Sequence, residues 1–294
     1  MDATLLKEHL QQYDLGALLQ CTPLLGGTVN TNYLLHTQKG KWVFTILESM
    51  PNALAQQISQ FLLFLNHHQF LTPIVQLTLS ENTIVSFQDK PSIIVTYING
   101  SSPLYPSQQQ CYQIGSTLAQ LHQLTQSYVC HLPNTMNNAW REKTAPLLMP
   151  YCTVKEQDLI RATLQEQAHL PYKALPHGIV HFDLFKDNSL FIGNRLQGII
   201  DFYYACYDTL LIDICICIHD WCTNWQAPKR AIIPENLTAL QKGYELVRPL
   251  TKIEHKTLPS MLKISALHFW LARSQSLKKD PNDYKQIFMN QFFN

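Results

Sequence analysis

Three polar residues in the second half of the chain, Asp183, Asn188 and Asp201, have the types and the order that phosphoryl transfer requires. In that reaction one carboxylate orients the attacking hydroxyl group and accepts its proton. An oxygen ligand and a second carboxylate hold Mg²⁺ against the phosphates of ATP. We therefore consider Asp183 the candidate catalytic base, and Asn188 and Asp201 the candidate Mg²⁺ ligands.

The local sequence predicts how these side chains are positioned. Residues 181–188 follow the spacing H-x-D-x-x-x-x-N of kinase catalytic loops. A short apolar strand is predicted at 189–192, a turn at Gly193-Asn194, and a returning strand at 196–200. Because a hairpin brings its two ends together, we expect both candidate cation ligands to reach one metal ion.

Each piece of this pattern has an ordinary alternative. H-x-D is a common tripeptide, and Asp or Asn in a loop often only shapes a turn. The combination of the loop, the hairpin and the carboxylate placed at the hairpin's exit favours the catalytic interpretation.

The chain as a whole resembles the aminoglycoside phosphotransferase and choline kinase group of small-molecule kinases, and within that group the homoserine kinases. The resemblance extends over most of the chain, from Tyr13 to Pro249. The segments that carry it are Tyr13–Gly16, Asn32–Thr37, His177–Phe185 with Asp187-Asn188, Gly198–Tyr203, Ala205-Cys206, Asp213-Ile214, Ile216-Cys217 and Trp221-Cys222. It implies an α+β, protein-kinase-like bilobal fold. Residues 1–100 would form a small nucleotide-binding lobe with an antiparallel sheet, and residues 101–294 a mainly helical catalytic and substrate lobe.

The resemblance also implies ATP and Mg²⁺ as cofactors and a small hydroxyl-bearing acceptor. For a homoserine kinase the acceptor is L-homoserine, and the product is O-phospho-L-homoserine on the route to threonine. His181 joins Asp183 among the catalytic residues by holding the loop in shape, and Asp213 supports the loop from a following helix. The implied nucleotide-binding residues lie in the first turn, in two strands and in the hinge between the lobes: Gly26, Gly27, Thr28, Asn30, Asn32, Thr45, Tyr97 and Ile98. An ordinary Gly-Gly turn and a plain interlobe turn are the alternatives.

One departure from the kinase pattern concerns the third strand. Thr45 occupies the place where protein kinases have a Lys that pairs with the ATP phosphates. The following helix, predicted over 52–68, contains no Glu for the usual ion pair. This departure leaves a second class of function open, a nucleotide-binding pseudokinase that serves as a scaffold.

The second lobe contains two further predictions. Trp140 and Arg141 lie in a segment, 134–146, that reads as polar and irregular, and Arg141 is a candidate for binding the substrate's carboxylate. A surface Arg on a locally packed Trp is the alternative. Asp213 lies on an apolar helix predicted over 209–223 with Asp208 as its N-cap. A carboxylate there requires hydrogen-bond partners, for which backbone N–H groups or His181 are expected.

The composition restricts the partners. The net charge of +1 and the absence of a Lys/Arg run argue against nucleic acid or an anionic membrane as the main partner. No secretory signal or membrane-spanning run is recognisable, and the 8 cysteines show no zinc-ligand spacing. Reduced thiols and a cytoplasmic location are therefore expected. The sequence gives no indication of oligomeric state.

Other acceptors remain open within the same class. A choline kinase requires an aromatic or acidic cage for the quaternary amine, and an aminoglycoside kinase requires an acidic cleft. The C-terminal region has few clustered acids, which argues against an aminoglycoside. A methylthio-sugar is a further alternative.

Overall fold

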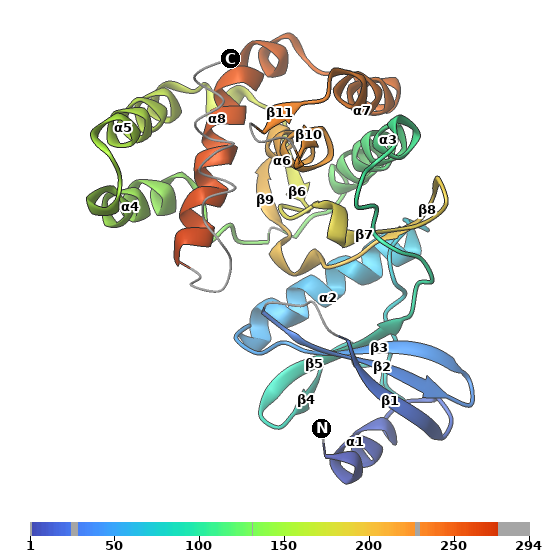
Figure 1. Cartoon of the computed structure of the whole chain (residues 1–294). Helices are drawn as coiled ribbons and strands as arrows, with labels where there is room; N and C mark the ends of the chain where they lie inside the picture. The colour runs from blue at the N-terminus through green and yellow to red at the C-terminus, as the bar shows by residue number, and fades with distance from the viewer. Residues whose placement is uncertain (1, 25–28, 131, 227–229, 276–294) are drawn as a thin grey trace. The chain divides into compact units, whose positions relative to one another are not determined.

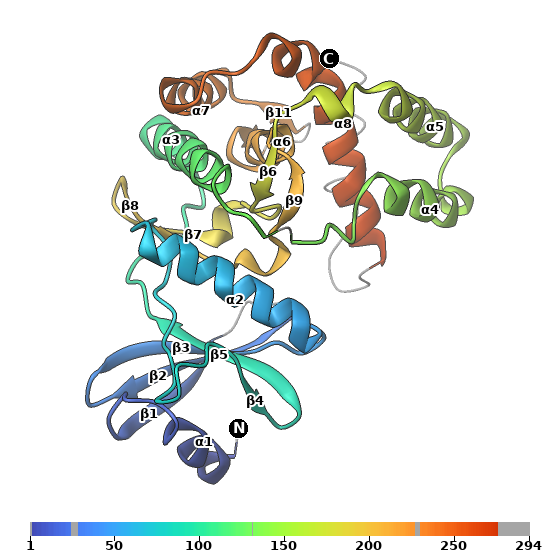
Figure 2. The same cartoon turned by 180° about the vertical axis from the view of Figure 1, so that it is seen from behind.

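Two units with separate cores make up the structure, a computed structural model that describes residues 2–24, 29–130, 132–226 and 230–275. The first unit comprises Met1–Ser101 together with Gln197–Tyr203. The second comprises Ser102–Leu196 and Tyr204–Asn294. Figures 1 and 2 show the course of the chain through both.

The first unit is built on a five-stranded antiparallel sheet with the order β1-β2-β3-β5-β4. Its strands are β1 (Leu18–Leu24), β2 (Thr31–Thr37), β3 (Gly40–Ile46), β4 (Val85–Phe87) and β5 (Lys90–Thr96). Helices α1 (Ala3–Leu10) and α2 (Asn52–His67) lie on opposite faces of this sheet (Figure 1). Apolar side chains of α1 and of the strands form a buried cluster that includes Leu6, Leu35, Phe44, Phe87 and Ile94.

The segment Gln197–Tyr203 returns to the first unit late in the chain. The N–H of Ile199 donates to the carbonyl of Leu71 at 2.8 Å, and the ring of Phe202 packs edge-on against Phe61. Gly198 lies against Ile98, whose terminal methyl group would be 2.5 Å from a Cβ at this position. The predicted boundary near residue 100 places this segment in the second lobe, whereas in the structure it belongs to the first unit.

The second unit is mainly helical. Its helices are α3 (Gln108–Thr125), α4 (Asn138–Leu148), α5 (Val154–His169), α6 (Leu211–Trp221), α7 (Pro234–Val247) and α8 (Lys252–Gln275). Helix α6 is buried along its whole length and lies between the α3–α7 pair and α8, while α4 and α5 lie beyond α8 (Figure 2). This arrangement makes α6 the centre of the unit.

Three small sheets accompany these helices. β6 (His177–Val180) pairs with β9 (Cys206–Thr209), and β10 (Thr223–Asn224) pairs with β11 (Ala231–Ile232). β7 (Ser189–Ile192) and β8 (Arg195–Ile199) form the predicted hairpin. Short 3₁₀ turns, η1 (Met149–Tyr151), η2 (Tyr172–Ala174), η3 (Lys186–Asn188) and η4 (Phe202–Tyr204), connect the elements.

The structure corrects two local predictions. The segment 134–146 is not irregular throughout, because α4 begins at Asn138 with the side chain of Asn137 accepting from the N–H of Trp140. Asp208 is not the N-cap of α6; it lies in β9, and the helix begins after Leu210 without a side-chain cap. Among the helices of the described residues, none has the length and apolar character to cross a membrane.

Helices α3 and α7 pack at unusually short range because each contributes a glycine. A Cβ at Gly115 would lie 2.1 Å from the carbonyl oxygen of Leu240. A Cβ at Gly243 would lie 2.1 Å from the carbonyl oxygen of Tyr112. Since backbone atoms, not flexible side chains, occupy these positions, neither contact tolerates a methyl group without moving a helix.

We expect Gly115→Ala and Gly243→Ala each to lower the free energy of unfolding by about 2–3 kcal/mol through overpacking. Gln120→Ala, at an exposed position of α3, is the control and should leave stability nearly unchanged or slightly higher. Urea unfolding of the three variants measures the difference. An unfolding free energy for both glycine variants equal to that of the control would contradict the close helix contact.

Candidate active site

The loop after β6 folds back on itself around Asp183. The N–H of Phe185 donates to the carbonyl of Asp183 at 2.8 Å. The side-chain amide of Asn188 donates to the same carbonyl at 2.7 Å and to Asp183 Oδ2 at 2.9 Å. Sequence positions 183 and 188 are thereby brought together, and Asn188 fixes the orientation of the half-buried Asp183 carboxylate.

These bonds also determine how the Asn188 amide is oriented. Both partners of the amide are acceptors, so the nitrogen must face them and the oxygen must face away. Asn188 therefore presents a carbonyl oxygen, which is the kind of ligand that Mg²⁺ prefers. The side chain fits the role of a cation ligand predicted for it.

A buried carboxylate on α6 holds the start of this loop. Asp213 accepts from the backbone N–H of His181 at 2.7 Å and of Phe182 at 2.8 Å. Backbone N–H partners are what the sequence predicted for this residue. Phe182 has a positive φ of 65°, which is unfavourable for a residue with a Cβ, and the two bonds to Asp213 help to hold it there.

A chain of hydrogen bonds continues from Asp213 into α3 and α7. His122 Nε2 lies 3.2 Å from Asp213 Oδ2, and its Nδ1 lies 2.7 Å from the hydroxyl of Tyr244. Since a carboxylate only accepts, Nε2 carries the proton, and Tyr244 donates to Nδ1 while accepting from Arg248 at 3.0 Å. Burial lowers the pKa of His122 despite the opposing effect of Asp213, which is consistent with a neutral imidazole.

His181 is completely buried and also serves the loop. Its Nδ1 accepts from the N–H of Asp183 at 3.2 Å, and its own N–H is bound by Asp213. These contacts indicate that His181 positions Asp183.

A second carboxylate of α6 contacts the loop further along. Asp220 lies two helical turns after Asp213 on the same face, and its Oδ2 accepts from the N–H of Lys186 at 2.6 Å. Burial raises the pKa of Asp220 to about 6, and the neighbouring Lys186 opposes that rise. The loop is therefore held by α6 at both its beginning and its middle.

In the first unit, a hydroxyl-rich cluster occupies the place of the missing Lys. Thr45 is buried, pairs with Asn32 across β2 and β3, and donates to Asn32 Oδ1 at 2.7 Å. The Thr45 side chain also lies near the hydroxyl of Tyr203, which follows Asp201 closely in the returning segment. Burial raises the pKa of Tyr203, so its hydroxyl stays protonated. Asp201 is exposed and has a positive φ of 63°.

The other predicted nucleotide-binding residues also lie in the first unit. Asn30 precedes β2 at a bend and is partly buried. Tyr97 and Ile98 follow β5; the N–H of Tyr97 donates to the carbonyl of Lys41 at 3.1 Å, and the ammonium group of Lys41 lies 5.9 Å from the Tyr97 ring centre. Gly26, Gly27 and Thr28 lie outside the described residues.

Arg141 is almost completely buried, and its guanidinium group is engaged within the protein. Nε donates to Gln167 Oε1 at 2.6 Å, and Nη1 lies 3.3 Å from the carbonyl of Met136 and 3.2 Å from His268 Nδ1. Nη2 donates to Asn138 Oδ1. These bonds do not support the predicted role of Arg141 in binding a substrate carboxylate.

Trp140 belongs to the same cluster. Its ring centre lies 5.1 Å from that of His268 on α8. Together, Trp140 and Arg141 connect α4 with α5 and α8.

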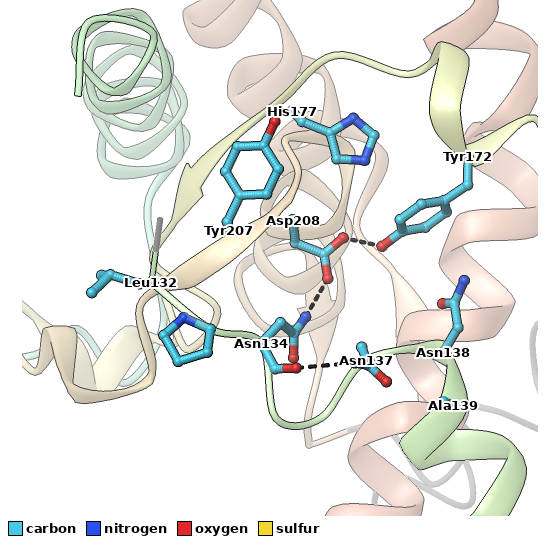
Figure 3. A pocket seen from close by; sticks show the side chains of 10 residues that line it. Leu132, Asn134, Asn137, Asn138, Ala139, Tyr172, His177, Tyr207 and Asp208 are labelled. Carbon is cyan, nitrogen blue, oxygen red and sulfur yellow. Dashed lines mark hydrogen bonds between the residues drawn. The ribbon is translucent and has the colours of Figure 1, made fainter. Parts of the chain in front are cut away.

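A polar cavity of about 600 Å³ lies beside β6 and β9 (Figure 3). Its wall contains Leu132, Pro133, Asn134, Asn137, Asn138, Ala139, Tyr172, His177, Tyr207 and Asp208. Asp208 accepts hydrogen bonds from the hydroxyl of Tyr172 and the amide of Asn134 (Figure 3). The polar groups largely satisfy one another, and none of the lining residues belongs to the catalytic loop.

Comparison with known proteins identifies the family to which the chain belongs. A model of the phosphotransferase enzyme family matches residues 20–250. The chain belongs to this family. It is a phosphotransferase that acts on a hydroxyl group of a small molecule, with ATP as co-substrate.

The chain is similar to several proteins named homoserine kinase. That of Methylobacillus flagellatus is 33% identical, with 96% of this chain and 91% of the relative covered. That of Polaromonas naphthalenivorans is 33% identical, with 90% and 84% covered. The similarity therefore extends through both units.

Solved structures confirm the protein-kinase-like α+β fold. An amicoumacin kinase, solved in complex with AMP-PNP, Ca²⁺ and Ami, has a TM-score of 0.76 at 15% identity, with 99% of this chain and 92% of that chain covered. A microcompartment-associated aminopropanol kinase has a TM-score of 0.68 at 15% identity, with 99% and 94% covered.

Some residues of the site were not predicted from the sequence. His122 and Tyr244 complete the hydrogen bonds behind Asp213, and Tyr203 joins Thr45. His122 lies on the apolar face of α3. An ionisable residue at such a position could have been used to predict a buried hydrogen-bond partner. Tyr203 gave no such signal, because its partner is more than 150 residues away in the sequence.

We expect Asp213→Asn to lower the free energy of unfolding by about 2–3 kcal/mol, because the amide nitrogen would face at least one N–H donor. The kcat should fall at least tenfold, since the loop that carries Asp183 would lose a support. Urea unfolding and steady-state kinetics measure both effects. Asp158→Asn, in an exposed ion pair on α5, is the control; equal behaviour of the two variants would rule out the bracing role.

The pH dependence of stability should reflect His219 on α6. Burial lowers its pKa to about 4 from 6.5, so the folded protein keeps it neutral while the unfolded chain protonates it. His219 therefore does not change the free energy of unfolding above pH 6.5. As the pH decreases from 6.5 to 4, this group lowers the free energy of unfolding by about 3 kcal/mol in total.

Urea unfolding at pH 7 and pH 5 tests this expectation. His219→Gln should show a smaller loss between the two values than the wild-type protein, whereas His169→Gln, at an exposed position, should show the same loss as wild type. An unchanged pH dependence in His219→Gln would show that this imidazole does not contribute. Part of the slope should remain, because burial also lowers the pKa values of His122 and His268.

Proposed function

We propose that this protein is a homoserine kinase, which transfers the γ-phosphoryl group of ATP to the hydroxyl of L-homoserine and gives O-phospho-L-homoserine for threonine synthesis. The observation that carries this proposal is 33% identity, through both units, to proteins named homoserine kinase. The held geometry of Asp183 and Asn188 supports it.

In this proposal Asp183 orients the acceptor hydroxyl and accepts its proton. Asn188 fixes the carboxylate through its amide nitrogen, and His181 and Asp213 hold the loop backbone. Because all of these groups are positioned before the acceptor arrives, the hydroxyl meets an oriented base.

The oxygen of Asn188 and the carboxylate of Asp201 would hold Mg²⁺, which when bound supplies positive charge for the phosphates. The oriented amide oxygen of Asn188 and the exposed carboxylate of Asp201 fit this role. ATP would be contacted by residues of the first turn and of the interlobe segment, among them Gly26, Gly27, Thr28, Asn30, Tyr97 and Ile98. Near the place of the usual Lys, Asn32 and Thr45 offer hydrogen bonds in place of a charge.

Purified protein with Mg-ATP should release ADP in the presence of L-homoserine. Asp183→Asn should lower kcat by roughly 10²–10⁴, because it removes the proton acceptor while keeping a similar shape. A coupled ADP assay with homoserine, choline, methylthioribose and an aminoglycoside measures the specificity.

Other outcomes separate the alternatives. Turnover with a different acceptor of this panel would keep the kinase but remove the assignment to homoserine. ATP binding without turnover of any acceptor would favour the scaffold function. Full activity of Asp183→Asn would exclude Asp183 as the base.

A further inference from the structure

Two charged groups beside the catalytic loop form a loose pair. The ammonium nitrogen of Lys186 lies 3.9 Å from Asp220 Oδ1, which is too far for a hydrogen bond. Asp220 Oδ2 is occupied by the backbone N–H of Lys186, whereas Oδ1 has no hydrogen-bond donor among the described residues. Within the same part of the chain, the Lys186 ammonium group has no hydrogen-bond acceptor.

The environment of this pair favours an ionic ligand. The side chains of Lys186 and Asp220 are only 16% and 11% exposed, so water screens their charges weakly. The indole of Trp225 lies 5.5 Å from the Lys186 ammonium group and is fixed by a bond from its Nε1 to the carbonyl of Asp220 at 3.0 Å. A partly buried ammonium group and a carboxylate oxygen that lack hydrogen-bond partners raise the free energy of the folded protein. A ligand that forms hydrogen bonds with both groups removes this cost.

The other charged groups around the pair are nearly balanced. The positive charge of Arg273 lowers the pKa of Asp220, and the negative charge of Asp187 raises it. The guanidinium of Arg230 lies 5.6 Å from the Trp225 ring centre. A ligand with a large net charge of either sign therefore gains little here. A ligand that carries one positive and one negative charge a few ångströms apart matches the pair.

We propose that Lys186 and Asp220 bind the zwitterionic head group of the amino-acid acceptor, with Lys186 donating to its carboxylate and Asp220 Oδ1 accepting from its ammonium group. This proposal rests on the proposed function and names the groups that recognise the substrate. It gives the role predicted for Arg141 to Lys186, because Arg141 already donates to protein acceptors from each of its three nitrogens.

The position of the pair in the loop fits the length of homoserine. The hydroxyl and the head group of homoserine are about 5 Å apart, and a hydrogen bond of about 3 Å at each end gives a span of about 11 Å. Lys186 follows Asp183 by three residues, which reach at most about 10 Å between backbone atoms. These lengths are compatible with a homoserine molecule that is bound by the pair and presents its hydroxyl to Asp183.

Two truncated acceptors test each half of the pair separately. 3-Aminopropan-1-ol is homoserine without its carboxylate, and 4-hydroxybutyrate is homoserine without its ammonium group. Lys186→Met should lower kcat/KM for homoserine and for 4-hydroxybutyrate roughly tenfold to hundredfold, and should lower kcat/KM for 3-aminopropan-1-ol much less. Asp220→Asn keeps an acceptor for the backbone N–H, and it should lower kcat/KM for homoserine and for 3-aminopropan-1-ol at least tenfold more than kcat/KM for 4-hydroxybutyrate.

Both analogues are measured as substrates and as competitive inhibitors of homoserine turnover, so that a slow substrate still reports its affinity. Lys252→Met, which removes an exposed charge at the start of α8, is the control and should match wild type. Equal losses with all three acceptors, or a loss confined to the KM for ATP, would overturn the proposal and indicate a structural or phosphate-binding role. If wild-type protein does not phosphorylate homoserine, the proposed function fails first, before any variant is compared.

Discussion

The catalytic loop depends on one interaction, the pair of hydrogen bonds from the backbone N–H groups of His181 and Phe182 to the buried carboxylate of Asp213. A buried carboxylate is unfavourable unless it is fully hydrogen-bonded, so Asp213 stabilises only a loop conformation that presents both donors. That conformation includes the positive φ of Phe182 and places Asp183 next to Asn188. The geometry of the candidate base thus follows from the need to satisfy a charge on a neighbouring helix.

Helix α6 performs this function twice. Asp213 and Asp220 lie on the same face, two turns apart, and each binds backbone N–H groups of the loop. Asp213 is fully satisfied by the loop and by His122, whereas Asp220 keeps one oxygen without a donor among the described residues. The same helix therefore holds the loop rigidly at Asp213 and, in our proposal, meets the substrate at Asp220.

The first unit lacks the Lys that protein kinases use to pair with the ATP phosphates, and polar uncharged side chains lie at that place. Thr45 stands where protein kinases have a phosphate-pairing Lys; its hydroxyl donates a hydrogen bond to Asn32 and lies near Tyr203. Tyr203 arrives there because Gln197–Tyr203 returns to this unit. Through this return, the segment that carries Asp201 is packed against the strands that carry the polar cluster.

The sequence by itself determined the class of chemistry, the hairpin after the loop and the α+β fold, because each depends on local spacing and on patterns that recur through the family. It did not predict that Arg141 would be buried, that Asp208 would lie in a strand, or that His122 would complete the partners of Asp213. Those features depend on contacts between side chains that are far apart in the sequence. Arg141, for example, bonds to Gln167, 26 residues away, and to His268, more than 120 residues away. Hydrogen-bond satisfaction of buried charges is a property of the packed chain, so only the tertiary structure decided which polar residues support the fold and which remain available to a ligand.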